Sequence, residues 1–192
     1  PIGPPGARGL APGGPIGDAA GMVSSAISIV HKALAVVRPQ FRLPLHHGHH
    51  GIAHWSRVFR HGRDLAKALD VDPAILAWFA FLHDSQRENE GSDPGHGPRA
   101  ADFAVRLRRR GAITELDARA FERLCEAMRQ HSNGRIDGEP ELLACWDADR
   151  LDLGRVGVRP RPEGLGSAFA RDPATIARAV AWTDAARRRW HS

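Results

Sequence analysis

The stretch that decides the fold is AILAWFAFLHD, residues 74–84. Nine apolar residues in a row end on an adjacent His83 and Asp84, which is typical of a helix buried on all sides. The preceding VDP, residues 71–73, predicts the helix start, with Asp72 as cap and Pro73 in the first turn. An unpaired His–Asp pair would be costly to bury, so the pair needs partners. The sequence offers His54 upstream and DADRLD, residues 147–152, downstream.

Helical periodicity recurs along the rest of the chain, and alternating strand patterns are absent, so we predict an all-α fold. The helices are expected at residues 18–37, 52–69, 98–110, 115–130 (with Thr114 as cap), 140–153 and 172–189. Residues 1–17 are rich in Pro and Gly and are expected to be disordered or an added segment. Residues 18–40 are expected to form an N-terminal helix packed on the core, and residues 41–192 the main domain with its C-terminal helix.

The composition is ordinary for a globular domain, with 42% hydrophobic and 26% charged residues. The net charge is +5, but basic runs such as residues 108–110 fall on predicted solvent faces without interleaved aromatics, which argues against nucleic-acid binding. Lysine occurs only at positions 32 and 67, and this arginine bias indicates a GC-rich, bacterial genome. Two cysteines, Cys125 and Cys145, favour a reducing, cytoplasmic location. No apolar run approaches the ~20 residues of a membrane span. The oligomeric state is not indicated.

Histidine is concentrated in one part of the chain, because nine of the eleven histidines lie between His46 and His131. Downstream, Leu142, Cys145 and Asp149 fall on one helical stripe, whereas Asp147 points about 200° away from it. The helical pattern therefore favours Asp149 over Asp147 as the carboxylate that faces the core. The tract at residues 46–50 looks rich in metal ligands, but flexible His tracts often bind metal adventitiously.

The ordered set HGIAHWSRV (residues 50–58), FLHD (81–84) and DADRL (147–151) resembles the HD-domain superfamily of metal-dependent phosphohydrolases. The resemblance covers about residues 45–157 and implies an all-α HD-domain helical bundle with the metal held between helices. It also implies that His54, His83, Asp84 and Asp149 are the ligands. Such a mixed N/O ligand set suits a divalent transition metal, Mn, Fe, Co, Ni or Zn, which would activate a water molecule.

Some HD proteins hold a second ion, with the motif Asp bridging the two. His96 and His131 are the histidines in the right order for it, although a loop residue and a helix-dipole partner are the alternative interpretations. One or two ions are therefore compatible with the sequence. The second ion matters because di-iron HD proteins include oxygenases. A third reading is a catalytically inactive HD scaffold that binds a ligand.

Basic and acidic residues near the motifs are candidates for substrate contact. Arg57, Arg87 and His50 are expected to bind substrate, with a structural ion pair as the alternative for the arginines. Asp84, Arg87 and Glu88 are the candidate catalytic residues. The ppGpp-hydrolysing branch carries a Glu-Asp pair where this chain has Arg87-Glu88, which argues against that substrate. The sequence thus predicts hydrolysis of a small phosphorylated metabolite or nucleotide.

Overall fold

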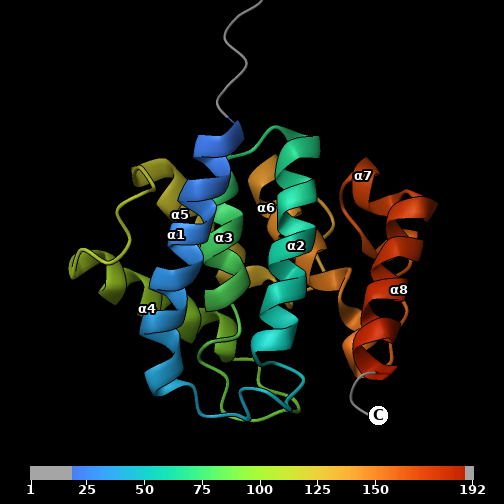
Figure 1. The fold of residues 1–192 in the computed structure, drawn as a ribbon, viewed down its shortest axis with the longest axis horizontal. Helices are drawn as coiled ribbons and strands as arrows, with labels where there is room; N and C mark the ends of the chain where they lie inside the picture. The colour runs from blue at the N-terminus through green and yellow to red at the C-terminus, as the bar shows by residue number, and fades with distance from the viewer. Residues whose placement is uncertain (1–18, 189–192) are drawn as a thin grey trace, which may run out of the picture.

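The computed structural model describes residues 19–188, and every regular element in this range is helical (Figure 1). The elements in chain order are α1 Ala19–Val37, η1 Arg38–Gln40, α2 Ile52–Leu69, α3 Pro73–Leu82, α4 His96–Arg109, α5 Ala118–Gln130, α6 Pro140–Arg150, η2 Leu153–Val156, η3 Pro162–Gly164, α7 Ala168–Arg171 and α8 Pro173–Arg188. The predicted all-α class is confirmed. The predicted disordered segment, residues 1–17, lies outside the described residues.

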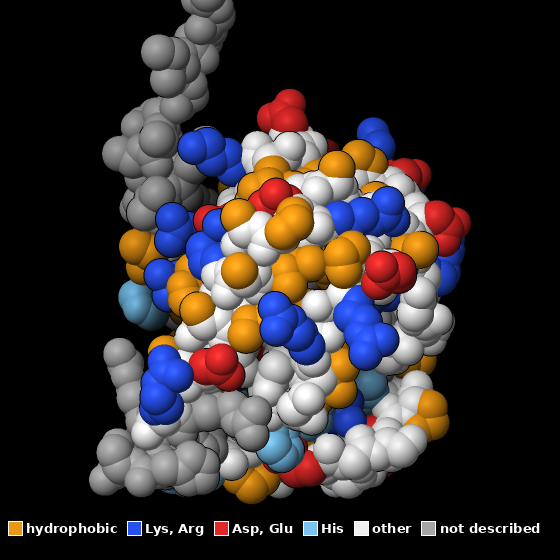
Figure 2. Space-filling model, turned by 90° about the vertical axis from the view of Figure 1, so that its right-hand side faces the viewer, with side chains coloured by type: hydrophobic (Ala, Val, Ile, Leu, Met, Phe, Trp, Pro, Cys, Tyr) orange, Lys and Arg blue, Asp and Glu red, His pale blue; other side chains and the backbone are white. Residues whose placement is uncertain are grey.

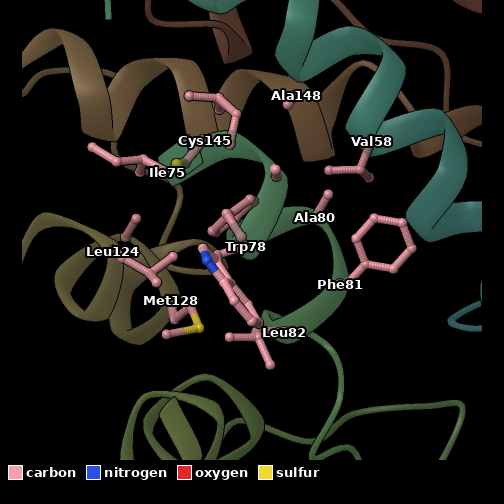
Figure 3. Packing of buried hydrophobic residues seen from close by; sticks show 14 of the residues in the cluster. Val58, Ile75, Trp78, Ala80, Phe81, Leu82, Leu124, Met128, Cys145 and Ala148 are labelled. Carbon is pink, nitrogen blue, oxygen red and sulfur yellow. The ribbon is translucent and has the colours of Figure 1, made fainter. Parts of the chain in front are cut away.

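Helix α3 forms the centre of the molecule, and all of its residues from Ala74 to Leu82 are buried. It begins as predicted, since the Asp72 carboxylate accepts a hydrogen bond from the backbone N–H of Ala74 at 2.8 Å. Helices α1, α2, α5 and α6 pack around it. Figure 3 shows Trp78 and Leu82 beside the α5 residues Leu124 and Met128. This all-round packing fixes the end of α3, where His83 and Asp84 follow.

Two helix starts differ from the sequence prediction. Helix α5 begins at Ala118, with Asp117 rather than Thr114 as its cap. Glu115, the first residue of the predicted helix, makes tertiary contacts instead of entering the helix. The Glu115 carboxylate accepts hydrogen bonds from Trp78 Nε1 at 3.3 Å and Lys32 Nζ at 2.5 Å. Helix α4 begins at His96, two residues before the predicted start, so His96 lies in its first turn.

The end of α6 also differs from the prediction. The helix stops at Arg150 instead of Leu153, so Asp152 leaves the helix and turns back towards the core. Asp147 is fully buried on the opposite side of α6. Its carboxylate accepts hydrogen bonds from Gly166 N (2.8 Å), Ser167 N (2.8 Å) and Ser167 Oγ (2.6 Å). Asp147 therefore anchors the segment that leads into α7.

Two long loops, residues 41–51 and 83–95, lie together at one end of the bundle (Figure 1). They are joined by the Arg42–Glu88 ion pair at 3.3 Å and by the His49 N–H, which donates to Glu90 Oε2 at 3.1 Å. At Gly51 the chain passes so close to the carbonyl of Leu45 that a Cβ would collide with it. Glycine at this position, directly before α2, lets the first loop fold tightly onto the start of that helix.

The face formed by α7 and α8 carries scattered basic side chains, mixed with acidic and hydrophobic ones (Figure 2). Within residues 19–188, no helix combines the length and the hydropathy that a membrane span requires.

His61 is a buried histidine between α2 and α8. Its ring is 3% exposed, lies 4.9 Å from the ring of Trp182, and leaves Nε2 without a hydrogen-bond partner. Burial lowers the pKa of His61 to about 4, and the opposing charge of Asp152 offsets this only in part. His61 is therefore a structural, neutral histidine at pH 7.

We expect His61 to make the fold sensitive to mild acid. The pKa of His61 is about 4 in the folded chain and 6.5 in the unfolded one. The free energy of unfolding is therefore unaffected by this group above pH 6.5 and decreases as the pH drops towards 4. The loss is about 2 kcal/mol by pH 5. Urea unfolding in chelator-containing buffer at pH 7 and pH 5 should show a shallower pH dependence for His61→Phe than for wild type. The exposed-site control His31→Gln should behave as wild type, and an equally steep dependence in His61→Phe would contradict the assignment.

Candidate metal centre

Six histidine and aspartate side chains converge between the helices near the loop end of the bundle. They are His54 of α2, His83 and Asp84 at the end of α3, His96 of α4, His131 directly after α5, and Asp149 of α6. All six residues are buried. Their ligand atoms form three overlapping groups, and the atoms within each group lie within 4.8 Å of one another. The structure thus brings together every residue that the sequence nominated as a metal ligand.

Each of the four histidines is held by a hydrogen bond from its Nδ1. The acceptors are Asp152 Oδ2 for His54 (2.7 Å), Phe79 O for His83 (3.0 Å), Asp93 O for His96, and Met128 O for His131 (2.8 Å). Carbonyl and carboxylate oxygens can only accept, so Nδ1 carries the proton in every ring. The Nε2 atoms are left with their lone pairs directed into the cluster, which is the arrangement found in metal-binding histidines.

The Nε2 atoms face each other in two pairs. His54 Nε2 lies 3.1 Å from His83 Nε2, and His96 Nε2 lies 2.7 Å from His131 Nε2. Two lone pairs at such distances repel each other unless a cation lies between them. At each pair this cation is either a proton or a metal ion.

Asp84 lies between the two pairs, with one carboxylate oxygen turned to each. Its Oδ2 is 3.5 Å from both His54 Nε2 and His83 Nε2. Its Oδ1 is 3.2 Å from His96 Nε2 and 3.7 Å from His131 Nε2. One carboxylate therefore contacts both halves of the cluster, as a bridging ligand would.

Asp149 completes the half of the cluster formed by His54 and His83. Its Oδ1 lies 3.5 Å from His54 Nε2 and 3.8 Å from His83 Nε2, and it is buried without a hydrogen bond. Burial alone would raise the pKa of Asp149, but the positive charge of Arg155 holds it well below its usual range. A buried, charged and unbonded oxygen beside two imidazole lone pairs fits a metal ion.

Burial lowers the pKa of His83 to about 3, so this ring is neutral and able to bind a metal at pH 7. The ring also stacks on Phe79, with a centroid distance of 4.8 Å. Gly97 brings the other pair together, because a Cβ there would collide with the carbonyl of Met128. This close approach lets His96 in the first turn of α4 reach His131 at the end of α5.

A search of solved structures shows what this arrangement of helices is similar to. The crystal structure of a predicted HD superfamily hydrolase from an uncultured Thermotogales bacterium matches 83% of this chain and 90% of that chain, with a TM-score of 0.60 and 24% sequence identity. The chain folds as an HD domain. No family model matches the sequence, and neither does any curated protein.

Arg57, a predicted substrate contact in this HD domain, is bound to a carboxylate behind the cluster. Its guanidinium donates to both oxygens of Asp152, at 2.5 and 3.1 Å, and Asp152 in turn accepts from His54. This is the ion-pair arrangement that the sequence left open as the alternative. Arg57 and Asp152 thus orient the His54 ring, a role that partners of metal-binding histidines commonly have.

Arg87 and His50, the other predicted substrate contacts, both touch Asp84. Arg87 Nη1 lies 3.5 Å from Asp84 Oδ1 and 3.3 Å from His96 Nε2. His50 Nδ1 donates to Asp84 Oδ2 at 2.7 Å. Both side chains are buried, so they border the cluster directly.

Glu88, a predicted catalytic residue, lies away from the cluster. Its carboxylate is half-exposed, and its ion-pair partners are Arg42 at 3.3 Å and Arg99 at 3.8 Å. The side chain faces outward because the loop turns after Arg87. Glu88 is therefore not part of the catalytic machinery that we propose.

The sequence interpretation missed two residues of the site, Asp152 and Arg155. Both follow α6, where the chain folds back in a turn and η2. Helical periodicity does not extend into such a turn, so it could not place them. For Asp152 the available signal was the third aspartate of DADRLD, three residues after the predicted ligand Asp149.

Proposed function

We propose that this HD domain is a metal-dependent phosphohydrolase that cleaves a phosphate ester of a small metabolite or nucleotide. The observation that supports this proposal best is the arrangement of the two histidine pairs around Asp84. The Nε2 atoms of each pair lie close together, and each pair faces one oxygen of the Asp84 carboxylate. A set of imidazole and carboxylate donors suits Mn, Fe, Co, Ni or Zn better than Ca. His54, His83, Asp149 and Asp84 Oδ2 would hold one ion, and His96, His131 and Asp84 Oδ1 the other.

Bound divalent ions lower the pKa of a water molecule to about 7 and polarise a phosphoryl oxygen. The protein holds the ligand side chains in fixed orientations and shields them from solvent. The hydrogen bonds at Nδ1 fix the tautomer and the orientation of each ring, and burial of the cluster strengthens its electrostatic interactions. No serine or cysteine nucleophile is needed for such a hydrolysis.

Arg87 is the proposed binding group for the phosphoryl oxygens. Its Nη2 donates to Gly91 O at 2.6 Å and its Nε to Asn89 O at 3.3 Å, so the loop fixes the guanidinium plane. Its Nη1 stays beside Asp84 and His96. A fixed guanidinium at this edge would bind a phosphoryl oxygen and stabilise the charge that develops there.

The two-pair arrangement also favours a second candidate, an HD-type di-iron oxygenase. Two histidine pairs that share one carboxylate provide places for two redox-active irons as readily as for two hydrolytic ions. The third reading, an inactive scaffold, would share the fold but would not turn over substrate.

Metal analysis combined with turnover separates these functions. The protein is stripped with chelator, reloaded with Mn, Co, Zn or Fe(II), and assayed for thermal stability, p-nitrophenyl phosphate hydrolysis and O₂ consumption. We expect two ions per chain, a gain in thermal stability and phosphate release. Two irons with O₂ consumption would favour the oxygenase. Absence of metal binding and of any thermal shift would leave only the scaffold.

A further inference from the structure

Arg155 is a largely buried arginine at the edge of the cluster, and the proposed hydrolysis assigns it no role. It lies in η2, and its side chain is 9% exposed. Its Nη1 donates to the Asp152 carbonyl at 3.3 Å, and its Nη2 lies 3.3 Å from Asp149 Oδ1. Its Nε–H is buried and has no hydrogen-bond partner. A buried donor without a partner is costly, which indicates that a ligand completes this site.

The contact between Arg155 and Asp149 cannot fully neutralise the arginine once metal is bound. Asp149 Oδ1 is the same atom that faces His54 and His83. When this oxygen serves as a metal ligand, its negative charge is shared with the ion. Arg155 then retains positive charge and an unused N–H, and a guanidinium in this state is suited to bind an oxyanion.

Asp149, the proposed metal ligand beside Arg155, has the most exposed side chain of the six in the cluster. The side chain of Asp149 is 12% exposed, whereas those of His54, His83, Asp84 and His131 are 3% exposed or less. A ligand that enters from solvent at Asp149 would therefore meet the guanidinium of Arg155 on its way to the metals.

Arg155 and Arg87 border different halves of the cluster. Arg155 contacts Asp149, in the half with His54 and His83, and Arg87 contacts Asp84 Oδ1 and His96 in the other half. The carboxylates that these two arginines contact are proposed metal ligands. Arg57 and Arg99 differ, because they pair with Asp152 and Asp93, which are not. Two arginines and two divalent ions carry more positive charge than Asp84 and Asp149 can offset.

We propose that Arg155 binds a second acidic group of the substrate, while the scissile phosphoryl group lies at the metals and Arg87. The preferred substrates are then compounds with two oxyanion groups a short distance apart, such as a diphosphate or a phosphorylated carboxylic acid. This inference rests on the proposed function and specifies its substrate class.

The test compares two non-hydrolysable probes by calorimetry on the metal-loaded protein. Methylphosphonate carries one acidic group and phosphonoacetate carries two, and metal content is measured after each titration. Wild type should bind phosphonoacetate roughly tenfold or more tightly than methylphosphonate, as a charge-assisted hydrogen bond would give. In Arg155→Gln this ratio should fall close to one, with methylphosphonate affinity nearly unchanged. Arg155→Lys keeps the positive charge but loses the planar set of guanidinium N–H donors, and should give an intermediate ratio.

Matched variants separate this inference from the proposed function. The control Arg159→Gln removes an exposed arginine from the same segment and should keep the wild-type ratio. Arg87→Gln should weaken both probes. An unchanged ratio in Arg155→Gln, or loss of its metal, would overturn the role of Arg155 and leave the hydrolase proposal in place. Failure of metal-loaded wild type to bind methylphosphonate at all would overturn the proposed function itself.

Discussion

Replacing Asp84 by alanine is expected to remove both metal ions and all hydrolysis. Its two carboxylate oxygens face the two histidine pairs, at 3.5 Å on one side and 3.2 Å on the other. In the variant the His96–His131 pair has no carboxylate beside it, and the His54–His83 pair keeps only Asp149. Metal content measured by mass spectrometry should fall from two ions per chain to nearly none. Phosphate release should fall by about 10³-fold or more, because each ion supplies several kcal/mol to the reaction.

Single-histidine variants provide the controls for this prediction. His96→Ala disturbs only the pair that it forms with His131, so it should lose one ion and keep the other. His46→Ala removes an exposed histidine outside the cluster and should keep both. If Asp84→Ala retained both ions, Asp84 would not bridge, and the two halves of the cluster would be independent sites.

The fold could be predicted from the sequence because its signals are local. The apolar run at residues 74–82 and the Asp72-Pro73 start specify α3, and Asp72 caps it as expected. The prediction was wrong at the start of α5, because the residue after the predicted cap Thr114 makes tertiary contacts instead of continuing into the helix. Glu115 accepts hydrogen bonds from Trp78 of α3 and Lys32 of α1, and α5 begins three residues later than the sequence indicates.

The order of the motifs, rather than the composition, identified the candidate ligands. The helical stripe that favours Asp149 over Asp147 agrees with their positions, since only Asp149 faces the histidines. Long-range pairings are not visible in periodicity. His50 reaches Asp84, and Asp152 reaches His54, only because loops and turns fold back over the helix ends.

A second pair of predictions concerns Asp149 and Asp147, two carboxylates two residues apart with opposite expected effects. Asp149→Asn should lose the ion held with His54 and His83, because an amide is a poor substitute for the charged oxygen there. Asp149 Oδ1 makes no hydrogen bond but forms an ion pair with Arg155 Nη2 at 3.3 Å, so the metal-free fold should lose some stability, although less than in Asp147→Asn. Metal titration and thermal unfolding in chelator measure the two effects separately.

Asp147→Asn should show the reverse pattern. The fully buried Asp147 carboxylate accepts three hydrogen bonds from Gly166 and Ser167, and an amide nitrogen in place of either oxygen would leave donors facing each other. We expect a loss of about 3 kcal/mol, or roughly 6–12 °C in Tm, with both ions retained. Ser167→Ala removes one of these bonds and also the cap that Ser167 Oγ provides to α7, and should cost about 2 kcal/mol. If Asp147→Asn lost metal while Asp149→Asn kept it, the face of α6 that we assign to the cluster would be wrong. Such a result would also contradict the proposed role of Arg155, because Arg155 is placed beside a metal ligand only through its contact with Asp149.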